Sequence, residues 1–187
     1  RVILSVGLGA LDTGFADFGE VTERKTRAEL LDESLEIIVL LWKGEPFTYF
    51  GKHYQIHYHK SNPGLPDPPV PVQKPRIPIW VVGAWSSKRS FDRAMKYDGL
   101  LPAILDKNKK VRMSPPTPSE IREMREYIES ARLINTPYDI IVDGKTPGDD
   151  TQKAKGIVLP YDEAGATWWI EALWDNPDLE TVLHRIQ

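Results

Sequence analysis

Five segments of the 187-residue chain are almost continuously apolar and short enough to be β-strands: 2–7 (VILSVG), 77–82 (IPIWVV), 98–101 (DGLL), 138–142 (YDIIV) and 166–171 (ATWWIE). Strands without polar alternation are typical of parallel sheets, in which both faces are buried. Helical patterns separate most of these segments. The alternation of strand and helix predicts an α/β fold with a parallel sheet.

End signals bound the predicted helices. Thr26 and Glu29 have the spacing of a capping box, so the first helix is predicted to begin at Thr26 and to stop at Gly44. Its buried stripe would consist of Leu31, Leu35, Ile38 and Trp42.

The later helices have similar signals. The stretch Thr117-Pro118-Ser119-Glu120 predicts the start of a helix that ends before Pro137. A helix over roughly 151–164 should stop at Gly165, and Asn176-Pro177-Asp178 should start the last one.

Residues 45–76 interrupt this alternation, and we interpret them as an insertion in a single domain that covers residues 1–187. Aromatic and β-branched residues flank Gly51, which predicts a hairpin turn near that glycine. The proline-rich part after the hairpin must be extended. A second irregular stretch, 106–118, is basic and contains prolines, which predicts a mobile surface loop.

The charge balance narrows the class of partner. The chain has 24 basic and 27 acidic side chains and a net charge of -3, so it has no positive electrostatic field that would attract nucleic acid or an anionic membrane. A small-molecule partner is expected. The lack of cysteine excludes disulfides, thiolate catalysis and zinc–thiolate sites. No apolar run is long enough to span a bilayer, and a cytoplasmic protein is expected.

Ligands of parallel α/β folds bind at the carboxyl ends of the strands, which are here Gly7-Leu8-Gly9, Gly83–Ser87, Leu101-Pro102, Asp143-Gly144 and Glu171. At Gly83, Ala84, Trp85, Ser86 and Ser87 a strand passes into a helix through small residues and hydroxyls. Exposed N–H groups at a helix start attract anions, so this stretch predicts a phosphate site. The alternative is that Ser86 or Ser87 only caps the helix of residues 88–96.

Other candidate residues have stronger structural explanations. Gly7-Leu8-Gly9 lacks the third glycine of a dinucleotide fingerprint and indicates a tight turn. His53, His57 and His59 could share one face of a strand, but a half-exposed hairpin explains them better than a metal. Trp168 and Trp169 should pack on opposite faces of their strand, Glu171 should pair with an arginine, and the acidic end of 143–150 should cap the next helix.

Several stretches together resemble the luciferase-like monooxygenase superfamily: RVILSVGLG, FADFGE, RAELLDESLEIIVLLWKGEPFTYFGKHYQI, PVPVQKPRIPIWVVGAW, RAMKYDGLLP and AGATWWIEAL. The resemblance implies a (β/α)8 TIM barrel and an oxidoreductase that depends on a flavin, FMN, or on the deazaflavin coenzyme F420. It makes 77–82 the fifth strand and assigns the cofactor phosphate to Gly83, Ala84, Trp85, Ser86 and Ser87. Relatives place a polar or basic residue in the loop at Ala10–Thr13. Here Ala10 is apolar, and Asp12 or Thr13 would substitute.

The same resemblance makes residues 2–7 the fourth strand, so the chain would be an incomplete TIM barrel with strands 4 to 8 and without its N-terminal βα units. No catalytic acid or base can then be named. The open barrel edge is expected to be covered by association, with a homodimer as the expected state.

Three functions stay open at this point. The first is a luciferase-like flavoprotein oxidoreductase that performs hydride transfer or monooxygenase-type oxygen activation on a small organic substrate. The stretch 83–102 resembles F420-dependent members more than FMN-dependent ones. The second is a non-catalytic flavin-binding relative, and the third is an unrelated barrel enzyme that binds a sugar phosphate.

Overall fold

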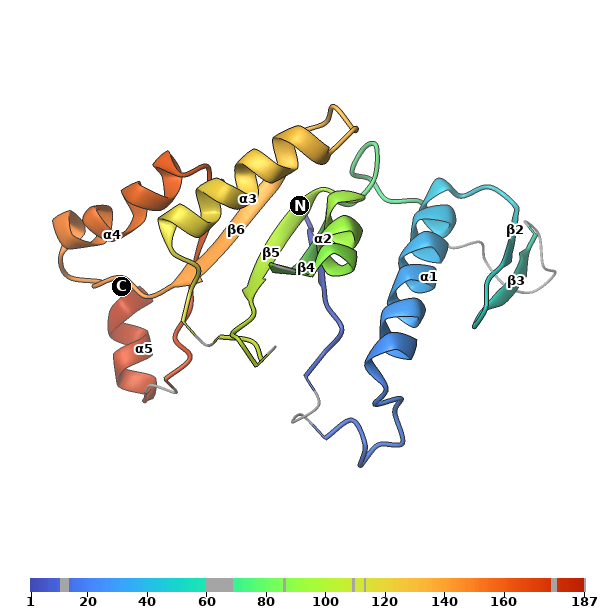
Figure 1. The fold of residues 1–187 in the computed structure, drawn as a ribbon, viewed down its shortest axis with the longest axis horizontal. Helices are drawn as coiled ribbons and strands as arrows, with labels where there is room; N and C mark the ends of the chain where they lie inside the picture. The colour runs from blue at the N-terminus through green and yellow to red at the C-terminus, as the bar shows by residue number, and fades with distance from the viewer. Residues whose placement is uncertain are drawn as a thin grey trace. The chain divides into compact units, whose positions relative to one another are not determined.

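A computed structural model describes residues 1–10, 14–59, 69–85, 87–108, 110–112, 114–175 and 178–186 of the chain. The chain divides into two compact units, Arg1–Ile79 and Trp80–Gln187. In the second unit, helices follow strands in regular alternation (Figure 1). The single-domain organisation of residues 1–187 stays a prediction. Within the described ranges, no helix combines the length and apolarity that crossing a membrane requires.

The first unit contains β1 (Leu4–Val6), the long helix α1 (Arg24–Lys43) and the hairpin strands β2 (Phe47–Phe50) and β3 (Gln55–Tyr58). The amide of Leu4 donates to the carbonyl of Pro78 at 2.9 Å. This hydrogen bond pairs β1 with the residue that directly precedes the strand beginning at Ile79.

Helix α1 begins two residues earlier than predicted. The cap is the carboxylate of Glu23, which accepts hydrogen bonds from the amides of Lys25 at 2.8 Å and Thr26 at 2.6 Å. A carboxylate has two oxygens and can accept from both amides at once, whereas the predicted Thr26 hydroxyl instead donates to Glu23. Gly44 ends the helix with φ 67°, as predicted.

The buried side of α1 differs from the predicted stripe. Of the four predicted residues only Leu35 is fully buried, and the others are half-buried. Ile37 and the charged Glu33 are buried as well. The sequence pattern could not reveal Glu33, because its burial depends on donors that come from the hairpin.

The predicted hairpin is confirmed, with β2 and β3 antiparallel and in register from Phe47↔Tyr58 to Phe50↔Gln55. The amide of Gly51 closes the turn on the Tyr54 carbonyl at 2.8 Å. The amides of Lys52, His53 and Tyr54 donate to the Glu33 carboxylate at 2.8, 3.0 and 2.9 Å. The hairpin is thereby fastened to α1. Most of the proline-rich stretch lies outside the described residues.

The second unit holds β4 (Ile79–Trp85), α2 (Lys88–Met95), β5 (Gly99–Ile104), α3 (Pro118–Ala131), β6 (Asp139–Gly144), α4 (Thr151–Glu163), β7 (Trp168–Glu171) and α5 (Leu179–Ile186). Its strands lie in the order β4-β5-β6-β7. The pairs β4/β5, β5/β6 and β6/β7 are parallel. The fold is therefore α/β, a partial TIM-like barrel, and the carboxyl ends of its parallel strands lie along one edge.

The core of the second unit comes from the middle of the sheet and one face of α3. Apolar side chains with less than 2% exposure include Val81, Leu100, Ile140, Ile141, Val142, Ile121 and Met124. Each large apolar side chain buried in this way contributes about 1.5–3 kcal/mol relative to exposure. The expectation of burial on both faces is wrong for β7, where Trp168 is 46% exposed.

The predicted ends of the later helices are confirmed. Thr117 and Glu120 form the capping box of α3, and Pro118 is the first helical residue. Asp150 caps α4 by accepting from the Lys153 amide at 3.0 Å, and Gly165 follows that helix with φ 99°. Asp178 accepts from the Thr181 amide at 2.8 Å at the start of α5. Asn176 and Pro177 lie outside the described residues.

Candidate functional site

The junction of β4 and α2 contains the predicted phosphate residues. Gly83 and Ala84 lie in β4 opposite Pro102 and Ala103 of β5, and both are buried. A side chain on Gly83 would come within 2.4 Å of Leu100 and 3.3 Å of Ala94. Close packing of α2 on the sheet therefore requires glycine at position 83, independently of any ligand.

The other residues of this junction have different surroundings. The ring of Trp85 packs against Phe91 and Tyr127 at centroid distances of 5.0 and 6.0 Å. The amide of Ala84 donates to the Ser90 hydroxyl at 3.0 Å. Ser87 occupies the cap position of α2 but its side chain makes no capping hydrogen bond. The structure therefore does not show Ser87 capping α2 through its side chain, which was the alternative to phosphate binding. Ser86 lies outside the described residues.

A pocket of about 480 Å³ opens at the carboxyl edge of the sheet, and we call it the carboxyl-edge pocket. It lies at the ends of β5, β6 and β7, where barrel and open-sheet enzymes bind their ligands. Its lining is mainly apolar: Pro102, Ala103, Ile104, Val111, Pro115, Pro116, Ala172 and Trp174. The other residues that line it are Gly144 and the polar Arg112, Ser114, Asp143, Lys145 and Asp175.

The loop between β5 and α3 forms one wall of this pocket and is braced by an ion pair. Arg112 donates to both carboxylate oxygens of Glu120, at 2.9 and 2.7 Å, and to the carbonyl of Pro115 at 2.9 Å. Hydrogen bonding to Arg112 lowers the pKa of Glu120, although burial acts in the opposite direction. Val111, in the described part of the predicted mobile loop, also forms a β-bridge with Leu105, which directly precedes that loop. The mobility of this loop stays a prediction.

The opposite wall is braced by side chains from the ends of β6 and β7. The Trp174 indole Nε1 donates to Asp143 Oδ2 at 2.9 Å, and Lys145 Nζ lies 2.7 Å from Asp175. The hydrogen bond from Lys145 lowers the pKa of Asp175. The charged side chains that line this pocket are thus engaged with groups of the protein itself.

Glu171, at the end of β7, is bound to the adjacent loop. Its carboxylate accepts from the amide and hydroxyl of Thr146 at 2.7 and 2.9 Å and from the indole of Trp169 at 3.2 Å. The predicted pairing of Glu171 with an arginine stays a prediction. Trp168 contacts Trp80 and Trp169 contacts Tyr161, so the two indoles pack against different neighbours, as predicted.

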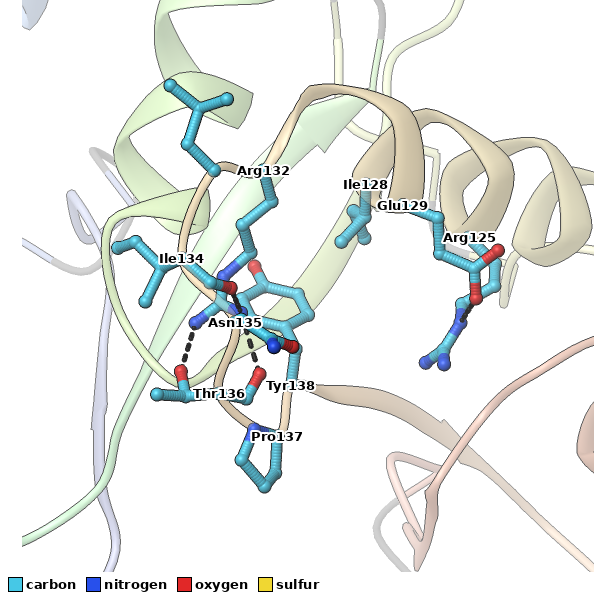
Figure 2. A pocket seen from close by; sticks show the side chains of 10 residues that line it. Arg125, Ile128, Glu129, Arg132, Ile134, Asn135, Thr136, Pro137 and Tyr138 are labelled. Carbon is cyan, nitrogen blue, oxygen red and sulfur yellow. Dashed lines mark hydrogen bonds and ion pairs between the residues drawn. The ribbon is translucent and has the colours of Figure 1, made fainter.

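A second pocket, of about 640 Å³, lies at the amino edge of the sheet, between the end of α3 and the start of β6 (Figure 2). Arg132 donates there to the carbonyls of Met95, Tyr97, Ile134 and Thr136 and to the Thr136 hydroxyl. Its guanidinium lies 4.7 Å above the Tyr138 ring. Burial raises the pKa of the Tyr138 phenol. These contacts brace connecting loops, which is the usual role of the amino face of a barrel.

The histidines of the first unit do not gather at one place. His53 Nε2 lies 2.9 Å from Glu29, and His57 packs edge-on against Phe50. The hydrogen bond from Lys52 and that of His53 lower the pKa of Glu29 to about 2. Among the described residues no group of three or more histidines and carboxylates could hold a metal ion.

The loop after β1 is held by a residue of α1 that sequence reasoning missed. Arg27 of α1 donates to the carbonyls of Leu8 and Gly9, and its guanidinium lies 5.0 Å from the ring centre of Phe15. Gly9 adopts φ 73°, which supports the predicted tight turn. Ala10 is exposed, and Asp12 and Thr13 lie outside the described residues.

Sequence reasoning also missed Arg112, Lys145 and Trp174 around the carboxyl-edge pocket. The strand-end positions of Pro102 and Asp143 had marked the edge at which this pocket lies. Trp174 lies three residues after the predicted end of the last strand, and this position was the remaining sequence signal that it could line a pocket at that edge.

Comparisons with known proteins agree with this fold. The sequence model of the family described as luciferase-like monooxygenase matches residues 1–131. The structure is similar to the crystal structure of the monooxygenase RslO1 from Streptomyces bottropensis, with a TM-score of 0.53 and 18% sequence identity. This similarity covers 88% of the chain and 47% of the RslO1 chain, so the chain spans about half the length of that relative. No curated protein matches the chain. The match over residues 1–131 shows that the chain belongs to the luciferase-like monooxygenase family.

Proposed function

We propose that this chain is the cofactor-binding part of an oxidoreductase that uses a flavin or deazaflavin on a small organic substrate. The observation that carries the proposal is the family match, because it includes β4 and the start of α2. Coenzyme F420 is our first choice and FMN the second, because residues 83–102 resemble F420-dependent members more closely. We further propose that the protein acts as a homodimer.

The start of α2 has properties that fit a phosphate group. The amides of the first helical turn lack intrahelical acceptors, and the helix dipole favours an anion there. The Ser87 hydroxyl makes no capping hydrogen bond and could donate to a phosphate oxygen. Lys88 is held by Asp92 at 2.9 Å. We therefore assign phosphate binding to Ser87 and the backbone amides rather than to Lys88.

When bound, reduced F420 would supply hydride, and reduced FMN would supply electrons for oxygen activation. The residues of the chain would bind and orient the cofactor. Gly83 would keep α2 close to the sheet, and Ser87 would hold the phosphate. The apolar lining of the carboxyl-edge pocket would exclude water from the reacting ring.

Titration with F420, FMN and riboflavin, which lacks the phosphate, tests the proposal. One phosphorylated cofactor should raise the melting temperature progressively as its concentration exceeds its Kd, and riboflavin should bind at least about tenfold more weakly. The substitution Ser87→Ala should weaken that binding about tenfold, since one hydrogen bond to a charged group is lost.

Ser119→Ala is the matched control, because Ser119 also lies in the first turn of a helix, α3, and is exposed. This variant should bind the cofactor as the unmodified chain does. Absence of stabilisation by both cofactors, or equal losses in the two serine variants, would contradict the proposal.

A further inference from the structure

We propose that the carboxyl-edge pocket binds an uncharged, planar aromatic substrate that stacks on Trp174. This inference rests on the proposed function, whose substrate class it specifies. It is drawn from three properties of the pocket: an exposed but tethered indole, an apolar lining, and charged groups that are already paired.

Trp174 is unusual because it is both exposed and held in place. Its side chain is 83% exposed, which leaves a large aromatic face in water. Its Nε1 is tethered to Asp143, which belongs to β6 at the centre of the second unit. Since the indole is already oriented, a ligand ring can stack on it with little further loss of side-chain freedom.

The remaining lining favours an apolar molecule of moderate size. Pro102, Ala103 and Ile104 come from the end of β5, and Pro115 and Pro116 from the loop that follows. These side chains present apolar surface and make no hydrogen bonds, so they favour binding of a ligand that buries apolar carbon atoms against them. The volume of about 480 Å³ lies within the usual range of small-molecule pockets.

The charged groups argue against an ionised substrate. Arg112 is bound to both oxygens of Glu120, and Lys145 is bound to Asp175. An anionic substrate would have to displace a carboxylate from one of these cations. A cationic substrate would have to displace a cation from Glu120 or Asp175, or compete with the Trp174 indole for Asp143. An uncharged molecule keeps both ion pairs intact, so the pocket selects against charge.

Binding of 2-naphthol, an uncharged two-ring probe, and of 2-naphthoate, its anionic counterpart, tests the inference. Calorimetry should detect 2-naphthol, with 2-naphthoate at least about tenfold weaker because of its desolvation. Among the six tryptophan indole N–H signals in nuclear magnetic resonance spectra, the signal missing in Trp174→Phe should shift most on binding. Equal affinity for the two probes would overturn the inference.

Substitutions locate the bound probe. Trp174→Ala should weaken 2-naphthol binding at least about tenfold, whereas Trp174→Phe should retain most of it because a stacking ring remains. Phe18→Ala is the control, because Phe18 is also 83% exposed but belongs to the first unit. This variant should bind 2-naphthol as tightly as the unmodified chain does. An unchanged affinity in Trp174→Ala would overturn the inference.

A further arm separates the substrate from the ring of the cofactor. A saturating concentration of whichever cofactor binds, F420 or FMN, should not displace 2-naphthol, because substrate and cofactor must be bound at the same time for the proposed reaction. Displacement would assign the pocket to the cofactor and overturn the substrate class. Binding of 2-naphthol by a chain that binds neither F420 nor FMN would contradict the proposed function while supporting this ligand class. Binding of F420 or FMN without binding of 2-naphthol would contradict the inference alone.

Discussion

The two edges of the sheet in the second unit place arginines beside pockets, but they use them differently. At the amino edge, Arg132 donates to four carbonyls and one hydroxyl and so joins the loops before β5 and β6. At the carboxyl edge, Arg112 is paired with Glu120 beside an apolar wall and an exposed tryptophan. The amino edge is built for stability, and the carboxyl edge leaves a surface for binding.

The largest predicted effect is at the amino edge. Arg132→Leu should lower the free energy of unfolding by about 3 kcal/mol, because several part-buried carbonyls lose their donor. Urea unfolding would measure the change. Arg132→Lys keeps the charge but not the fork of donors, so most of the loss should remain. Full stability in Arg132→Lys would show that charge, and not hydrogen bonding, braces this edge.

Gly83→Ala should lower the free energy of unfolding by about 2 kcal/mol, because the added carbon would be forced against Leu100 and Ala94. Thermal unfolding without cofactor would measure this. Ser87→Ala should leave stability within about 0.5 kcal/mol, because its side chain makes no capping bond. The pair of variants separates packing from binding at one junction. Equal stability of Gly83→Ala and the unmodified chain would contradict the packing argument.

Acid should loosen the carboxyl edge more than the amino edge. Arg112 holds the pKa of Glu120 below its usual value of 4.5, so this pair stabilises the fold above that pH, and the stabilisation is lost as pH falls through the folded pKa. The change amounts to about 1 kcal/mol. Amide hydrogen exchange, corrected for its intrinsic pH dependence, should rise in 105–112 between about pH 5 and about pH 3.

Exchange in residues 132–137 serves as the internal reference, because Arg132 donates there to carbonyls and a hydroxyl, which do not titrate in this range. The variant Glu120→Gln should reduce the pH dependence of 105–112 without abolishing it, because the Asp106 carboxylate also accepts hydrogen bonds from the amides of Asn108 and Lys110. A rise of equal size in both segments would show global unfolding and would contradict the predicted difference between the edges.

The smallest predicted effect is that of Trp174→Ala on stability. The side chain is 83% exposed and buries little, so the free energy of unfolding should change by less than about 0.5 kcal/mol. Chemical denaturation would measure it. A larger loss would indicate that Trp174 braces the carboxyl edge structurally, as Arg132 braces the amino edge.

Much of the local structure could be predicted because its causes are local. Gly44 and Gly165 end helices through their left-handed backbone, and Thr117 and Glu120 bond to each other across one turn. The start of α1 was predicted incorrectly because two possible caps lie three residues apart, and the Glu23 carboxylate accepts from two amides. A pattern of residue types does not decide between such neighbours.

The amino-acid sequence by itself determined the order of strands and helices, the hairpin and the parallel α/β class, and it predicted the carboxyl edge as the place of ligand binding. These follow from hydrophobic period and turn chemistry, which act over a few residues. Only the tertiary structure decided that Arg112 pairs with Glu120, that Asp143 tethers Trp174 31 residues away, and that Glu33 fastens the hairpin. Such contacts join residues distant in the chain, and their partners become defined only when strands and helices pack together.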